Sequence, residues 1–191
     1  MRKSHSNQNA YVYPSPLCPH TGLLRIGLWT CRLSLGRHGV TFRKKEGDGA
    51  TPVTDLRLTR LFLRPDQGCL FYPPALPTQI IKPQHGWCDD VLHPRYNQLI
   101  NRPFHASHEE MWRSDALYNL VLDTNWNKKP CIKGRGSAIF IHVQRADQGP
   151  TAGCLAFQAP LLLRLLKRIP RLNCFRIQPA SRKPIKKLPR L

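Results

Sequence analysis

Hydrophobic and polar residues alternate in short runs along most of the chain, a pattern typical of β-strands with one buried face. Residues 23–29 are largely apolar, and apolar residues alternate with polar ones through 31–35 and, less regularly, through 56–63. Two further apolar runs, at 118–123 and 137–143, also predict strands. The pattern as a whole predicts a mainly β domain.

The segments between these runs predict turns, loops and two short helices. Residues 37–39 favour a hairpin turn, and the Gly, Asp and Pro residues of 44–52 favour a loop. Residues 72–103 are rich in proline and show little periodicity, which is typical of a long functional loop. The S-x-x-E sequence at 107–110 fits a capping box, so a short helix should start there and contain Met111, Trp112 and Asp115. Leucines at helical spacing in 160–169 predict an amphipathic helix.

Length and composition fit one domain with irregular ends. The chain has 191 residues, of which 41% are hydrophobic, so it can bury a core. Its 18 prolines and 12 glycines are scattered, which favours many turns and few long helices. We expect a flexible leader at 1–22, a folded domain at 23–169 and a basic C-terminal tail at 170–191.

The formal net charge of +19 is unevenly distributed. From residue 164 to the last residue there are ten Lys and Arg and no Asp or Glu. Such a tail is attracted to polyanions, whether nucleic acid, anionic lipid or an acidic cell-wall polymer. Charge alone does not choose among these partners.

The seven cysteines argue against a zinc ribbon or a disulfide framework. Their number is odd and no CxxC pair occurs, so we expect mostly buried or free thiols. No run approaches the 18 apolar residues of a membrane-spanning helix. The first ten residues lack the apolar run of a secretory signal. We therefore expect neither a membrane-spanning helix nor a signal peptide.

The strand predicted at 137–143 carries a histidine, and a Gly-Cys pair follows it after a short loop. An imidazole that takes the thiol proton leaves a nucleophilic thiolate in an ion pair. Backbone N–H groups near Gly153 could bind a developing oxyanion. These residues predict Cys154 as nucleophile and His142 as base. A histidine on a strand is more often a core residue, so spacing alone leaves both interpretations open.

Four short segments in a fixed order are more specific than any one of them. They are EGDGATP at 46–52, HGWCDD at 85–90, GSAIFIH at 136–142 and PTAGC at 150–154. This series resembles the YkuD-type L,D-transpeptidases, in the branch whose cysteine motif is shortened. The resemblance covers about residues 25–168, which is most of the chain.

The resemblance implies a β-sandwich or barrel with a few short helices and no cofactor. It implies that a peptidoglycan stem tetrapeptide acylates Cys154, releasing its terminal D-residue, and that the acyl group then passes to an amine on another stem. His142 would be the base, and the Gly153 region would supply oxyanion donors. The chain departs from the commoner family pattern at Ala152, where histidine is usual, and at Ala156, where arginine is usual.

Five residues are candidates for the walls of a substrate cleft: Thr151, His85, Trp87, Tyr96 and His108. The composition of 85–90 fits a metal cluster, a cleft wall or a structural turn. Because the resemblance implies no metal, we expect none. His108 would either help to orient the cysteine–histidine pair or lie in the cap region of the helix predicted to start at 107–110.

Two other functions remain open at this level. Hydrolysis on the same scaffold, as in an L,D-carboxypeptidase, would use water as acceptor, and no sequence feature separates it from transfer. A polyanion-binding protein with a vestigial enzyme fold would account for the charge. Stem peptides imply the cell envelope or periplasm, where the tail would meet an anionic surface, although no signal sequence is recognisable. We expect no specific nucleic-acid partner.

Overall fold

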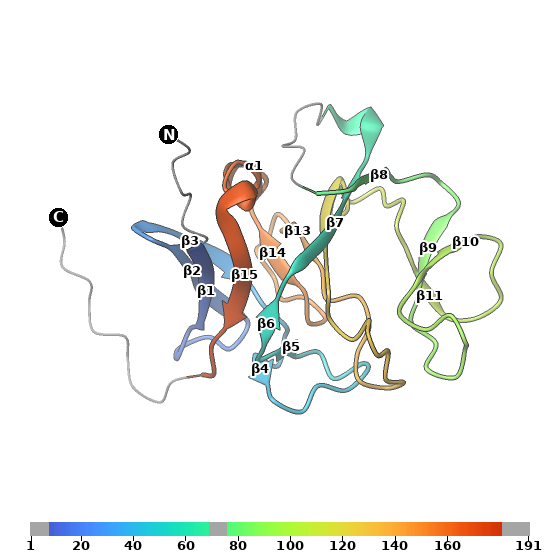
Figure 1. The fold of residues 1–191 in the computed structure, drawn as a ribbon, viewed down its shortest axis with the longest axis horizontal. Coiled ribbons are helices and arrows are strands. Elements are labelled where there is room, and N and C mark those ends of the chain that lie inside the picture. The colour runs from blue at the N-terminus through green and yellow to red at the C-terminus, as the bar shows by residue number, and fades with distance from the viewer. Residues whose placement is uncertain (1–7, 69–75, 181–191) are drawn as a thin grey trace, which may run out of the picture.

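The computed structural model describes residues 8–68 and 76–180, and these form mainly β structure (Figure 1). The strands are β1 (Gln8–Pro14), β2 (Thr21–Ile26), β3 (Trp29–Ser34), β4 (Val40–Thr41), β5 (Thr51–Pro52), β6 (Asp55–Leu56), β7 (Leu58–Leu63), β8 (Thr78–Ile80), β9 (His85–Cys88), β10 (Leu99–Asn101), β11 (His108–Glu110), β12 (Leu120–Thr124), β13 (Ile141–Val143), β14 (Leu155–Phe157) and β15 (Leu172–Ile177). The helices are α1 (Ala159–Leu166) and the 3₁₀ helices η1 (Pro65–Gln67) and η2 (Ile169–Arg171). The predicted fold class is confirmed.

The largest sheet curls until its two edges approach each other. Its strand order is β6-β15-β1-β2-β3-β14-β13-β12-β7-β8. β6 pairs with β15 and β7 pairs with β12, yet only Arg57 separates β6 from β7 in the chain. Because one residue spans at most about 3.6 Å, the two ends of the sheet must lie close together. The sheet is therefore barrel-like, as the resemblance implies.

Strand alternation divides the hydrophobic residues between two clusters on opposite faces of this sheet. Ile139 and Ile141 lie in the main core, which the buried leucines of α1 also join. Phe140 lies instead in a second cluster, together with Cys154 and Trp87. The burial of these side chains alternates as predicted for 137–143, but only Ile141–Val143 forms a strand, and Ala138 has a left-handed φ of 47°. The chemistry of this segment lies on the outer face of the barrel.

A small three-stranded sheet, ordered β10-β9-β11, supplies the other side of the second cluster (Figure 1). Its central strand contributes Trp87, whose ring meets that of Phe140 edge to face at a centroid distance of 4.9 Å. The long loop predicted at 72–103 therefore contains β8, β9 and β10, while residues 69–75 lie outside the described residues. This segment therefore forms one side of the cluster that contains Cys154.

The predicted leader and tail are corrected in part, because both contain strands of the large sheet. β1 pairs in parallel with β15 and antiparallel with β2. Ala10, Val12 and Phe175 are fully buried, so residues 8–14 and 172–177 belong to the domain. Residues 1–7 and 181–191 of the predicted leader and tail lie outside the described residues.

Two local predictions are wrong because pairing between distant segments overrides them. Residues 108–110 form β11, which pairs antiparallel with β9, rather than the helix that the capping box suggested. The turn at 37–39 exists, but β4 pairs in parallel with β5 instead of forming a hairpin with β3. The helix predicted at 160–169 is confirmed by α1, with Leu162 and Leu165 buried. No helix in the described ranges is long and apolar enough to cross a membrane.

Candidate active site

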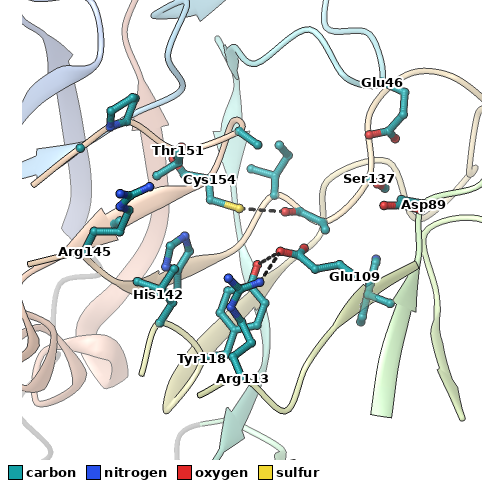
Figure 2. A pocket seen from close by; sticks show the side chains of 18 of the residues that line it. Glu46, Asp89, Glu109, Arg113, Tyr118, Ser137, His142, Arg145, Thr151 and Cys154 are labelled. Atoms are coloured by element: carbon teal, nitrogen blue, oxygen red, sulfur yellow. Dashed lines mark hydrogen bonds and ion pairs between the residues drawn. The ribbon is translucent and has the colours of Figure 1, made fainter. Parts of the chain in front are cut away.

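A cavity of about 450 Å³ opens on the outer face of β13 and β14, between the two sheets (Figure 2). Charged and reactive side chains from segments far apart in the sequence line it. They include Lys44, Glu46, Trp87, Asp89, Glu109, Arg113, Tyr118, Ser137, Ala138, His142, Arg145, Thr151, Ala152, Cys154 and Ala156. The fold thus brings Cys154, His142, Thr151 and Trp87 together, as the sequence predicted.

Cys154 lies immediately before β14, with its thiol held by the backbone of the preceding segment. Sγ donates to the Ala138 carbonyl at 3.0 Å and accepts the Phe140 N–H at 3.3 Å. Burial raises the pKa of this thiol to about 12, and the nearby Glu109 carboxylate acts in the same direction. The free site therefore holds Cys154 as a thiol.

His142 lies on β13, which is parallel and adjacent to β14, and its side chain is on the same face as that of Cys154. β13 and β14 pair Ile141 with Leu155, so His142 and Cys154 are diagonal neighbours across the ladder. Nδ1 lies 2.8 Å from the Val143 carbonyl, which can only accept, so Nδ1 carries the proton of the neutral ring. Nε2 is left with a free lone pair, the state a general base needs.

The protonation states differ from the ion pair that the sequence suggested. Burial lowers the pKa of His142 to about 4, and the positive charge of Arg113 adds to this effect. With the thiol of Cys154 protonated as well, the free pair is neutral.

A tight turn at 151–154 positions the thiol. The Thr151 hydroxyl donates to the Cys154 carbonyl at 2.7 Å and accepts the Gly153 N–H at 3.1 Å. The Gly153 N–H is therefore engaged within the turn rather than free for an oxyanion. The Cys154 N–H has no acceptor among the described residues and remains a candidate donor.

Asn97 fixes the segment around Ala138, whose carbonyl accepts the hydrogen bond from the Cys154 thiol. The sequence did not predict this role. Oδ1 of Asn97 accepts the N–H of Ala138 and the indole N–H of Trp87, both at 3.1 Å. Its amide nitrogen donates to the carbonyls of Trp126 and Asn127. Ala138 adopts a left-handed φ of 47°, which this clamp helps to maintain. Trp87 is buried and is itself part of the cavity wall.

Glu109, Arg113 and Tyr118 form a second polar group that lines the cavity, and the sequence did not predict it either. The Tyr118 hydroxyl donates to Glu109 at 2.7 Å, and Arg113 lies 3.7 Å from the same carboxylate. The ring of Tyr118 meets that of His142 edge to face at 5.3 Å. Desolvation raises the pKa of Glu109. The helix predicted to start at 107–110 concealed the role of Glu109, which lies instead on β11 and lines the cavity.

Three of the predicted substrate-binding residues do not line the cavity. His85 is buried, and its Nδ1 accepts the Lys82 N–H. Tyr96 is buried and donates its hydroxyl to Glu46, which does line the cavity. Nδ1 of His108 lies 2.8 Å from the Ala106 carbonyl oxygen, and the ring packs edge to face on Phe104. These side chains support the walls.

The two departures from the family pattern both lie at the cavity. Ala156 pairs with His142 in the parallel ladder and lines the cavity with a small side chain. Ala152 lies in the turn that holds Cys154. Guanidinium groups reach the cavity from other positions instead, through Arg113 and Arg145.

The lowered pKa of His142 predicts a pH-dependent stability. An unfolded histidine titrates near pH 6.5, whereas the folded one stays neutral down to about pH 4. The unfolded state therefore binds the extra proton first, and stability falls as pH drops through this window, by about 3 kcal/mol in total. Denaturant unfolding at pH 7.5 and pH 4.5 should show a larger loss in the wild type than in His142→Asn, which keeps the contribution of His85, whose pKa burial also lowers. Equal losses in both proteins would contradict it.

Comparison with known proteins supports one family. Searches of curated proteins and of solved structures gave no significant match. Within the described residues, no group of three or more His, Cys, Asp and Glu side chains could hold a metal ion. A family model for the L,D-transpeptidase catalytic domain, YkuD, matches residues 24–177, which include the whole cavity from Lys44 to Ala156. The chain therefore belongs to the YkuD family of L,D-transpeptidase catalytic domains.

Proposed function

We propose that this chain is a cysteine-dependent acyltransferase that cross-links peptidoglycan stem peptides through a thioester on Cys154. One observation carries the proposal: Cys154 and His142 lie on the same face of adjacent strands in one cavity, with the proton of the imidazole fixed on Nδ1. The family membership supplies the reaction class. Electrostatic attachment of the basic tail to an anionic envelope surface would keep the enzyme near its polymer.

In the first half-reaction, Nε2 of His142 takes the thiol proton while Sγ bonds to the acyl carbonyl carbon. The Cys154 N–H is the candidate donor to the resulting oxyanion. When the intermediate collapses, the C–N bond to the terminal D-residue breaks, and the leaving amine takes the proton from Nε2. A thioester remains on Cys154.

In the second half-reaction, an amine on another stem attacks the thioester carbonyl. It gives one proton to Nε2, the C–S bond breaks, and the proton returns to the departing sulfur. An amide joins the two stems, and the free enzyme is restored. Water in place of the amine would release a free carboxylate, which is the hydrolytic alternative.

Product analysis separates these two acceptors. A stem tetrapeptide should be incubated with the enzyme, with and without an excess of an amine-bearing stem peptide, and the products identified by mass. We expect release of the terminal D-residue in both reactions and a cross-linked dimer when the amine is present. Hydrolysed tripeptide alone, at every amine concentration, would replace transfer by hydrolysis. No release at all from a folded sample would contradict both.

A further inference from the structure

We propose that Glu109 is a second acid–base group of this site, which takes a proton from the amine that accepts the acyl group. This inference rests on the proposed acyl transfer and assigns a residue to its second half-reaction. His142 and Glu109 line the same cavity from two different sheets, His142 on β13 of the large sheet and Glu109 on β11 of the small one. Figure 2 shows His142 on one side of the Cys154 sulfur and Glu109 on the other.

The Glu109 carboxylate is held in the cavity by groups on its own wall. Glu109 is opposite Trp87 in the antiparallel ladder of β11 and β9, so the two side chains share a face of the small sheet, and both line the cavity. The Tyr118 hydroxyl donates to Oε1 of Glu109 at 2.7 Å, and Arg113 lies 3.7 Å from the same oxygen. Because Tyr118 is buried, its hydroxyl fixes the position of the carboxylate.

The second carboxylate oxygen of Glu109 is available to a substrate. Oε2 has no hydrogen-bond partner among residues 8–68 and 76–180, and it keeps accessible surface. The side chain as a whole is 33% exposed. Arg113 pairs more closely with Asp115 than with Glu109, so it leaves much of the negative charge of Glu109 uncompensated. Oε2 can therefore accept a proton from a group that enters the cavity.

The second half-reaction requires such a proton acceptor in addition to His142. A primary amine titrates at about pH 10.4, so at neutral pH it arrives as an ammonium ion without a lone pair. It must lose one proton before it attacks and a second one afterwards. Burial lowers the pKa of His142 to about 4, whereas burial raises that of Glu109 above its ordinary value, so Glu109 is the stronger base of the two.

The proton transfers balance when each group takes one proton. The ammonium group gives a proton to Oε2 of Glu109, and the neutral amine then attacks the carbonyl carbon of the Cys154 thioester. The tetrahedral intermediate gives a second proton to Nε2 of His142, which returns it to the sulfur as the C–S bond breaks. Glu109 releases its proton to solvent. The products are the amide and the free thiol, and both bases are restored.

The test compares Glu109→Gln with the matched control Glu110→Gln. Gln keeps an oxygen that can accept the Tyr118 hydroxyl, but it takes up no proton at neutral pH. Glu110 is the next residue of β11, has a side chain that is 53% exposed and does not line the cavity. Each protein is acylated by a stem tetrapeptide and then mixed with one of two acceptors. One is a stem peptide with a free amine, and the other is the same peptide with an aminooxy group in its place, which is neutral at this pH and requires no base to expose its lone pair.

We expect Glu109→Gln to slow transfer to the amine by about 10²–10⁴-fold and transfer to the aminooxy peptide by much less. Acylation should be no slower than in the wild type, because the variant removes a negative charge that raises the pKa of the Cys154 thiol. Glu110→Gln should match the wild type in all three reactions. Equal losses with both acceptors, or unchanged transfer to the amine, would overturn the role of Glu109 alone. A wild type that forms no thioester would overturn the acyl transfer and this role with it.

Discussion

Replacement of His142 by Asn is expected to slow acylation of Cys154 by about 10²–10⁴-fold, the usual contribution of a general base. Asn retains a donor that can reach the Val143 carbonyl, now 2.8 Å from Nδ1, so the strand should keep its local bonding. It removes Nε2, which we propose accepts the thiol proton. The rate of thioester formation, followed by mass spectrometry over time, measures the effect.

His93→Asn is the matched control for this loss. His93 also makes a backbone hydrogen bond through Nδ1, to the Arg95 N–H, but it does not line the cavity. Its substitution should leave acylation unchanged. If His142→Asn acylated at the wild-type rate, His142 would be a structural residue and another base would have to be found.

Replacement of Gly153 by Ala is expected to destabilise the fold and to displace the nucleophile. A Cβ at this position would lie 2.9 Å from the Ala50 carbonyl oxygen, and the backbone has a φ of +139° that side chains rarely adopt. Overpacking of this kind costs about 1–3 kcal/mol, and the backbone strain adds to it. Because Cys154 is the next residue, the shift should also lower acylation sharply. Denaturant unfolding and the acylation rate measure the two effects.

Gly47→Ala separates strain from crowding. Gly47 also has a positive φ, of +70°, but a Cβ there would meet no atom within 4 Å. The Gly47→Ala variant should therefore lose only about 1–2 kcal/mol of folding stability and keep its acylation activity. Equal losses of stability in both variants, with Cys154 still reactive in Gly153→Ala, would show that the close approach to Ala50 is unimportant.

The sequence predicts the reactive part of the fold well because one physical rule governs it. Alternation in a strand assigns every second residue to the same face. Within β13, Ile141 faces the main core and its neighbour His142 faces the cavity, and the parallel register pairs His142 with Ala156, two residues after Cys154. The four ordered motifs carry the family assignment, which the family model confirms over residues 24–177.

The remaining features depend on contacts between segments far apart in the chain. Nothing local in residues 8–14 indicates pairing with β15, more than 150 residues away, so both segments resemble loose ends in the sequence. The capping box at 107–110 is a weak local signal, and pairing with β9 overrides it. That single error concealed Glu109 and its bond to Tyr118. The supporting role of Asn97 likewise requires three loops to meet.

The most direct test of the account is the intact mass of the protein after reaction with a carbapenem-like β-lactam, beside a Cys154→Ser control. Opening the lactam ring on sulfur loses no atoms, so a thioester adds the full mass of the compound. We expect one such adduct on the wild type and none on Cys154→Ser. A folded wild-type protein that forms no adduct, or a Cys154→Ser variant that still forms one, would contradict Cys154 as the activated nucleophile.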